Sequence, residues 1–395
     1  MTTDNKPISF LHLLSLNTLL YVSIALYAPF LSAYYRQHGL TTTQIGMLSM
    51  IACISTIFIQ PLWARRADLT GKARTYASIV TAGVAAALMT YYLGTSFQNF
   101  LFSASLLAVF STSVSPMVDA IVIRNARELG YDFSKIRLGG TIGYAIVVYF
   151  VGSFLKAHPS AQFTLAAVSY LVFALAIRLL PKSEDEQPIA VTEKKKRFNF
   201  NLEENFRTHD VIYVLLFAFV FQLGAGFSGA YLSVYAVDLG YTQSEIGLMQ
   251  FCSASSEIPI LLLAHRLFRR FDSVKLIGIG CLLMGIRIFI VSGGSLAFFI
   301  CSQLMQGVTY MVIHYGCSTY ISAAARVGKA SECQSILHIV QTGIASILAY
   351  LFGGRLIEWI GFAPSYRLVG CAVLVTSVVL MFIMRGKTEP HTEAI

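Results

Sequence analysis

A long series of apolar runs constrains this chain more than any other feature of its sequence. An α-helix needs about 20 apolar residues to cross a lipid bilayer, because each residue adds about 1.5 Å to its length. The 395 residues are 56% hydrophobic and only 12% charged, which is too little charge for a protein surrounded by water. We therefore predict an all-α membrane protein with twelve transmembrane helices. They are expected approximately at residues 10–35, 44–64, 74–95, 98–124, 137–156, 161–180, 210–236, 244–266, 275–292, 295–323, 332–356 and 365–385.

A polar stretch divides these runs into two sets of six. Residues 181–209 are rich in charge and lack apolar periodicity, which is typical of a solvated connector. The sequence thus predicts an N-terminal six-helix bundle at 1–180, a cytoplasmic connector and a C-terminal six-helix bundle at 210–395. The first apolar run is too long for a removable signal peptide and lacks a cleavage site, so we expect it to stay as the first helix.

The basic residues favour one side of the predicted membrane. Most of the 29 Lys and Arg residues lie in the N-terminus, the loops after even-numbered helices, the connector and the C-terminus. The opposite loops hold only Arg36, Lys156, Arg355 and Arg367. This asymmetry predicts that both termini are cytoplasmic in a bacterial inner membrane, and it explains the net charge of +9 without a nucleic-acid partner. Membrane lipid is the expected partner of the basic run at 193–197.

Motifs for catalysis, metals or cofactors are missing from the places where they could work. The seven cysteines lie in or beside predicted helices without metal-type spacing, and we interpret them as packing residues. No nucleophile elbow or phosphate-binding loop occupies a usable loop. The sequence therefore predicts neither an enzyme nor a cofactor-binding or metal-binding protein.

One segment of the chain occurs twice. "LSAYYRQHGLTTTQIGML" at 31–48 is echoed without a gap by "LSVYAVDLGYTQSEIGLM" at 232–249. The shared residues are Leu31, Ser32, Tyr34, Gly39, Thr41, Ile45 and Gly46 in the first copy and Leu232, Ser233, Tyr235, Gly240, Thr242, Ile246 and Gly247 in the second. Each copy spans the end of the first helix of a half, the following loop and the start of the second helix. The two halves are therefore expected to share one plan.

The loop after the second helix carries a known family pattern. "PLWARRADLTGKAR" at 61–74 resembles the signature of the major facilitator superfamily, P-L-x-G-x-L-A-D-R-x-G-R-R, although the match is incomplete. The resemblance implies two six-helix bundles that rock about a shared site to give alternating access. It also implies a cytoplasmic gate formed by Asp68, Gly71, Lys72 and Arg74. A generic basic turn would fit the same residues.

Among the charged residues within predicted helices, four form two candidate pairs. Charges there are costly unless they face a cavity or a partner, so they mark candidate sites. Asp119 near the end of helix four and Arg137 at the start of helix five can meet across a short loop. Glu257 in helix eight and Arg287 in helix nine lie at similar depth and form a second candidate pair. Each pair either serves function or is a structural ion pair, and buried pairs add little net stability.

Longer stretches around these residues resemble particular transporter groups. "MVDAIVIRNARELGYDFSKIRLGGTIGYA" at 117–145 resembles the lactose permease group, which implies that Asp119 and Arg137 bind the substrate and that Tyr144 stacks on it. Tyr144 stands where that group has tryptophan. "MGIRIFI" and "HYGCSTYISAAA", with the acid Glu257 and "LFRR" at 267–270, resemble the 3-phenylpropionate transporter group. "IRLGGTIGYA" is similar to the nucleoside permeases.

Polar residues of helix ten and helix one extend the candidate site. The lactose permease group carries a histidine and a glutamate in helix ten for proton coupling. The matching positions of this chain are Gln306 and Thr309, so that relay is missing. Helix ten instead shows a polar stripe at helical spacing, and helix one offers two polar contacts one turn apart. The residues concerned are Gln303, Gln306, Tyr310 and His314 in helix ten and Asn17 and Tyr21 in helix one. Proton coupling would then use Asp119, Glu257 or His314, because burial favours the neutral form of a carboxyl group and histidine titrates near neutral pH.

The sequence predicts a monomeric secondary active transporter that imports a small organic solute together with a proton. An aromatic or other carboxylic acid is the first choice, since two arginines could bind an anion. A sugar or nucleoside is the second, and a drug or metabolite exporter is a further alternative. A receptor or an enzyme fits poorly, because no loop is long enough to hold a catalytic set.

Overall fold

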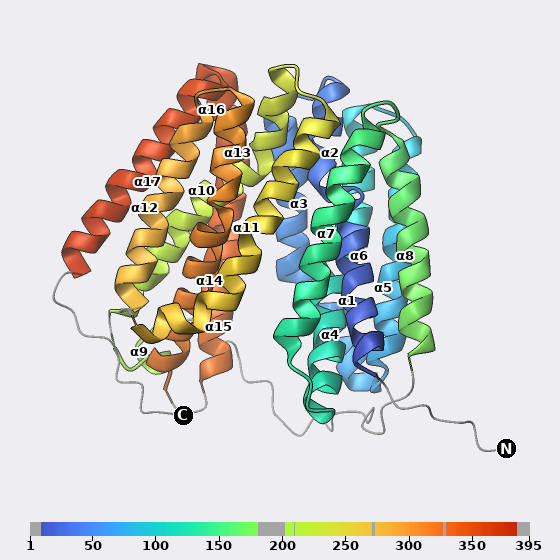
Figure 1. Ribbon diagram of the computed structural model, residues 1–395, viewed down its shortest axis with the longest axis horizontal. Helices are drawn as coiled ribbons and strands as arrows, with labels where there is room; N and C mark the ends of the chain where they lie inside the picture. Colours follow the sequence, from blue (N-terminus) through green and yellow to red (C-terminus); the bar gives the residue numbers. More distant parts are fainter. Residues whose placement is uncertain (1–8, 181–201, 209, 271–272, 327–328, 385–395) are drawn as a thin grey trace. The chain divides into compact units, whose positions relative to one another are not determined.

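The computed structural model of the protein describes residues 9–180, 202–208, 210–270, 273–326 and 329–384. Within these residues the regular structure is helical, apart from an isolated antiparallel bridge between Phe206 and Ala325 (Figure 1). Side chains at 201–203, 261–273 and 331 are outside the description, as are the connector with its basic run at 193–197 and the side chains of the 267–270 motif.

The helices follow the apolar runs closely. In the first half they are α1 (Phe10–Ala25), α2 (Ala28–Gln37), α3 (Thr42–Phe58), α4 (Gln60–Thr70), α5 (Ala73–Met89), η1 (Thr90–Tyr92), α6 (Phe97–Glu128), α7 (Phe133–Leu155) and α8 (Ala161–Leu179). In the second half they are α9 (Leu202–Asn205), α10 (Val211–Asp238), α11 (Gln243–Arg270), α12 (Ser273–Val291), α13 (Leu296–Leu304), α14 (Gln306–Ala324), α15 (Ala330–His338), η2 (Ile339–Ala345), α16 (Ser346–Ile360) and α17 (Phe362–Met384).

Ten helices in the described part of the chain are long and apolar enough to cross a membrane. Each coincides with one of the predicted spans, and several are built from two consecutive segments, such as α1 with α2 and α3 with α4. The segments α2 and α4 each carry a proline in their first turn, where its missing N–H costs nothing. The two other predicted spans, 74–95 and 244–266, coincide with α5, which has 17 residues, and with the more polar α11. Twelve spans therefore stay a prediction.

The contacts divide the chain into two compact units. Unit 1 contains Met1–Leu40, Ile51–Lys194 and Gly240–Phe251, and unit 2 contains Thr41–Met50, Lys195–Leu239 and Cys252–Ile395. The end of each repeat copy is thus grouped with the other half of the sequence. Residues 41–50 of the first copy belong to unit 2, and residues 240–251 of the second copy belong to unit 1.

Glycines permit the close helix packing inside unit 1. The helix α1 packs along α7, and α5 packs along α8 (Figure 1). A methyl group added at Gly143 would lie 2.8 Å from a carbon of Thr18, and one at Gly139 would overlap Leu14. The small residues on this face of α7 therefore allow α1 to pack closely against it.

Unit 2 is built in the same way around α12 and α17, which lie side by side (Figure 1). A methyl group at Gly285 would lie 3.0 Å from the carbonyl oxygen of Gly370, and one at Gly370 would lie 2.9 Å from the amide nitrogen of Phe289. Stacked rings complete the core at one end, where Tyr235 and Phe362 have centroids 4.9 Å apart and an interplanar angle of 4°. Backbone approach and ring packing therefore fix the helices of this unit.

The repeat copies begin their second helices with similar caps of different charge. In the first copy, the Thr41 N–H donates to Gln44 Oε1 at 3.0 Å, and the Gln44 N–H donates back to the Thr41 hydroxyl at 3.3 Å. In the second copy, the Thr242 N–H donates to a carboxylate oxygen of Glu245 at 2.8 Å, and the Thr242 hydroxyl bonds to the same oxygen. Only the first shows the reciprocal bonds of a capping box, and only the second carries a negative charge of its own.

In the first copy, a glutamate of α16 supplies the negative charge at the helix start. Glu358 accepts the Thr43 N–H at 2.9 Å and the Thr43 hydroxyl at 2.7 Å, while the Thr42 hydroxyl donates to the carbonyl oxygen of Gly354 at 2.8 Å. A carboxylate at a helix N-terminus is favourable because the first N–H groups have no partner within the helix. A distant residue thus completes the start of α3.

Candidate functional site

The charged residues of unit 1 form a partly exposed cluster. Arg137 Nη1 lies 3.6 Å from Asp119 Oδ2, with side chains 38% and 24% exposed. The predicted contact between helices four and five is therefore present. At this distance the pair is loose, and both side chains keep room for other partners.

Two residues of α1 complete this cluster. Asn17 is fully buried, and its amide nitrogen lies 3.5 Å from Asp119 Oδ1, whereas its own oxygen has no partner. The Arg137 guanidinium lies 4.9 Å from the ring centre of Tyr21, a cation–π distance. Acceptors, donors and an aromatic face thus meet at one place, as the sequence predicted for Asn17 and Tyr21.

The helices carry these side chains deeper than expected. The helix α6 extends to Glu128, past the predicted end at 124, so Asp119 lies about 13 Å inside it. Pro116, one turn before Asp119, removes a helical hydrogen bond beside the site. Gly140 of α7 lets α1 approach, because a methyl group there would overlap Tyr21 and come within 2.5 Å of Asn17 Oδ1.

The arginine of unit 2 has a different environment. Arg287 is only 6% exposed, and its Nη2 donates to Gln303 Oε1 at 2.6 Å while its Nη1 bonds to Gln306 Oε1. Nη1 also lies 3.5 Å from the Thr309 hydroxyl, and Nε has no partner. We call Arg287, Gln303, Gln306 and Thr309 the amide cluster. The sequence predicted Glu257 as the partner of Arg287, and that pairing stays a prediction; the hydrogen bonds described above go to the two amide oxygens and to Thr309.

A break in helix ten positions the amide cluster. The segments α13 and α14 are separated at Met305, where the Gly307 N–H donates to the Ser256 hydroxyl of α11 at 2.9 Å. That hydroxyl donates to Ser253 at 2.7 Å and lies 3.4 Å from the Gln303 carbonyl oxygen. In a regular helix the Gly307 N–H would bond to Gln303 directly, so Ser256 is inserted into the helical ladder. The insertion sets the direction of the two glutamines.

Helix eleven contains a second irregularity that the sequence did not predict. The segment η2 is a π-helical turn that includes the buried Gln341, and His338 directly precedes it. His338 lies 3.4 Å from the Thr342 hydroxyl. Such turns are frequent at functional sites, but they carry no simple sequence signal.

The remaining predicted residues are placed as follows. Tyr310 and His314 stack with centroids 5.6 Å apart and an interplanar angle of 5°, and His314 is exposed. Tyr144 is half-buried on α7, two turns beyond Arg137. The proposed roles of these residues in binding and proton coupling stay predictions.

The predicted gate forms the turn between α4 and α5. Gly71 caps α4 with a φ of 63°, a conformation that favours glycine. Arg74 is buried and donates from Nη1 to the carbonyl oxygen of Leu180 at 2.6 Å, which ties this turn to the end of α8. Asp68 and Lys72 are exposed, and the gating role of all four stays a prediction.

Apolar helices that carry a few buried charged groups are typical of membrane transport proteins. Among the described residues, no group of three or more His, Cys, Asp or Glu side chains could hold a metal ion. The MFS_1 like family model matches residues 11–368. The chain therefore belongs to that family and is a transporter of the major facilitator superfamily, as its sequence predicted.

Known proteins resemble the chain over nearly its whole length. The maltose permease of Geobacillus stearothermophilus is 28% identical and covers 91% of each chain. The probable 3-phenylpropionic acid transporter of Escherichia coli (strain K12) is 21% identical, with 86% of this chain and 89% of that one covered. The crystal structure of the nucleoside transporter NupG superposes with a TM-score of 0.75 over 96% of this chain and 99% of that one at 16% identity, which establishes the shared fold. The protein is thus an integral membrane protein whose relatives are transporters.

Proposed function

We propose that this chain is a secondary active transporter that imports a polyhydroxylated solute, with a saccharide as the first choice, by proton symport and alternating access. It would act as a monomer in the bacterial inner membrane with both termini in the cytoplasm. The bundles 1–180 and 210–395 would be its two moving halves, joined by the connector at 181–209. This ranks a saccharide above the carboxylic acid expected from the sequence.

The cluster of Asp119, Arg137, Asn17 and Tyr21 carries the proposal. A carboxylate accepts hydroxyl protons, a guanidinium and an amide donate to hydroxyl oxygens, and an aromatic face packs on the apolar side of a sugar ring. The loose ion pair leaves lone pairs and N–H groups available for such bonds. The similarity to a maltose permease supports the same substrate class.

The same carboxylate supports proton coupling. Asp119 can hold its charge against Arg137 or take up a proton when the arginine turns to the substrate, because a nearby opposite charge favours the ionised form. Substrate binding and proton binding would then be linked at one ion pair. Glu257 and His314 are the other proton carriers in the proposal.

Uptake into vesicles that contain the purified protein tests this function. We expect uptake of radiolabelled maltose, chosen as the probe sugar, to exceed that of 3-phenylpropionate and uridine. An inward proton gradient should raise it, and a protonophore should abolish the rise. A substrate panel transported without regard to the gradient would refute symport, and efflux alone would indicate an exporter.

Arg137→Lys sharpens the test. An ammonium cannot reproduce the forked donors of the guanidinium, so we expect sugar uptake to fall at least about tenfold, the loss that follows from about 1.4 kcal/mol of binding. Arg124→Lys is the matched control, because Arg124 forms an exposed pair with Glu128 at 3.2 Å near the end of α6, the helix that carries Asp119. Normal uptake in Arg137→Lys would remove Arg137 from the substrate site.

A carboxylic acid is the second candidate, and the amide cluster favours it. The hydrogen bonds of the buried Arg287 go to neutral amide oxygens, and its Nε is unpartnered. Such a cation can still bind a carboxylate. Gln306→Glu would add a competing negative charge beside Arg287. If the substrate is a carboxylate, this variant should abolish 3-phenylpropionate uptake, whereas Gln334→Glu in α15, the next helix along the chain, should not.

A further inference from the structure

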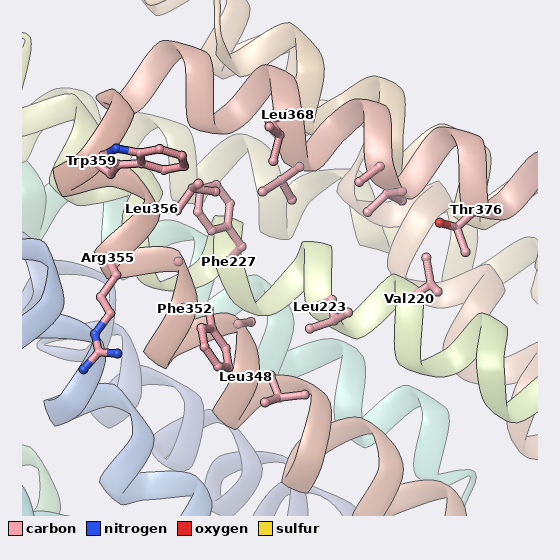
Figure 2. Close-up of a pocket in the computed structure, with 15 residues that line it drawn as sticks. Val220, Leu223, Phe227, Leu348, Phe352, Arg355, Leu356, Trp359, Leu368 and Thr376 are labelled. Carbon is pink, nitrogen blue, oxygen red and sulfur yellow. The ribbon is translucent and has the colours of Figure 1, made fainter.

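An apolar groove in unit 2 lies apart from both charged clusters. It runs between α10, α16 and α17, and its volume is about 720 Å³ (Figure 2). Leucine, valine and phenylalanine side chains form most of its lining, and Arg355, Trp359 and Thr376 supply polar atoms. The volume is that of a small-ligand pocket, for which about 300–1,000 Å³ is usual.

The length of the groove matches one leaflet of a bilayer. Along α16 the lining extends from Leu348 to Trp359, which is about 16 Å of helix. The hydrocarbon core of a bilayer is about 30 Å thick, so one leaflet is about 15 Å. The three helices that form the groove all belong to candidate membrane spans. An acyl chain is therefore the apolar occupant that this groove would meet in a membrane.

The charged residue of the groove lies at one of its two ends. Arg355 and Trp359 both lie on α16 at one end of the groove, with the Arg355 guanidinium directed away from the Trp359 ring, and Val220 and Thr376 lie at the opposite end (Figure 2). Trp359 is 82% exposed, as expected of a tryptophan at the membrane interface. Arg355 is also exposed, which places a cation where a lipid headgroup would lie.

We propose that this groove binds an anionic phospholipid, with one acyl chain along α10, α16 and α17 and the phosphate held by Arg355. The charge of the guanidinium complements the headgroup, and its forked N–H groups fit phosphate oxygens. The site does not involve the residues proposed to bind the transported solute.

The two tryptophans of the chain allow a direct test. In Trp63→Phe protein, Trp359 at the mouth of the groove is the only source of tryptophan fluorescence. Vesicles are made from mixtures of phosphatidylcholine and phosphatidylglycerol, with bromine on the acyl chains of one lipid at a time. The quenching gives the relative binding constant of the two lipids at Trp359.

We expect phosphatidylglycerol to bind about fivefold better than phosphatidylcholine, the ratio for about 1 kcal/mol per basic residue at an anionic lipid. Arg355→Gln should lower the ratio to one. Arg367→Gln should leave the ratio unchanged. Arg367 is also exposed and lies near the start of α17, but it does not line the groove. Equal binding of both lipids by the parent protein, or equal losses in the two variants, would overturn the proposal.

A second pair of variants tests the groove itself. Ala372→Phe fills the lining and should weaken the selective quenching, whereas Cys371→Phe on the neighbouring exposed position should not. Slow thiol labelling of the buried Cys281 and Cys317 checks that each variant is folded. If a second copy of the protein occupies the groove, brominated lipids will fail to quench Trp359 and crosslinks will join the copies, which would also overturn the proposal.

Discussion

The two arginine clusters of the protein differ in the groups that accept from the guanidinium. Arg137 of unit 1 is 38% exposed and lies beside a carboxylate, whereas Arg287 of unit 2 is 6% exposed and bonds to amide oxygens. An ion pair can be opened by a proton on its acid, but an amide clamp stays the same at any ordinary pH. The difference teaches that an arginine in a helix bundle can be held in two chemically distinct ways, one that a proton can open and one that stays the same over the ordinary pH range.

Arg287→Lys should have the largest effect, because it breaks the amide clamp. Gln303 and Gln306 are bound by two different guanidinium nitrogens, and a single ammonium nitrogen lacks this forked spacing, so it would bond well to only one of them; a buried acceptor left unsatisfied costs about 1–3 kcal/mol. We expect a clear loss of stability, measured by the rate at which a thiol-reactive dye labels buried cysteines on heating. Arg178→Lys is the control, since Arg178 donates to Thr75 from an exposed position. Equal stability in both variants would contradict the clamp.

Asp119→Asn should come next, because it converts the ion pair of unit 1 into an amide contact. The pair is partly exposed, so its loss should cost at most about 1 kcal/mol of stability. The effect on coupling should be larger. We expect the variant to exchange radiolabelled maltose across the vesicle membrane but not to accumulate it under a proton gradient. Gradient-driven accumulation at the parent level would exclude Asp119 as the proton carrier.

Ser256→Ala should have a smaller effect on the amide cluster. Without the inserted hydroxyl, the Gly307 N–H can return to the Gln303 carbonyl, and one hydrogen bond of about 0.5–1.5 kcal/mol is exchanged for another. We therefore expect the rate of amide hydrogen exchange at Gly307 to change, together with little change in thermal stability. Ser253→Ala is the matched control one turn away. Unchanged exchange at Gly307 would show that Ser256 does not hold the break.

Thr309→Val should have the smallest effect. The Thr309 hydroxyl lies 3.5 Å from Arg287 Nη1, which is too far for a strong bond, and it also donates to the Met305 carbonyl oxygen at 2.9 Å. Valine keeps the shape, so we expect a change below about 1 kcal/mol in the same labelling assay. A loss as large as that of Arg287→Lys would mean that Thr309 is a main ligand of the guanidinium.

Much of the fold could be predicted from the sequence, because bilayer thickness fixes the length of an apolar helix. The predicted runs coincide with helices, and the Asp119–Arg137 contact followed from a short loop. The extension of α6 to Glu128 was missed, since its last turns are polar and look like a loop.

The finer geometry of the site could not be predicted. The break at Met305 depends on Ser256, which lies about fifty residues earlier and has no sequence pattern that links it to helix ten. The amide acceptors of Arg287 were not predicted as its partners, because a carboxylate in a neighbouring helix is a stronger sequence signal than an amide. Only the close approach of α11 to α14, where a methyl group at Gly307 would lie 3.0 Å from the Glu257 nitrogen, brings these groups together.

The cap on α3 limits how far the two repeat copies can be interchanged. A chimera with 232–249 in place of 31–48 would put a glutamate at position 44, directly after position 43, whose backbone amide already binds Glu358. Two acids would then compete for one helix end, and like charges at that spacing repel. Each repeat copy is thus adapted to the partner of its own helix end, although the two copies share one plan. Transplanting one copy would require a neutral residue in place of Glu358.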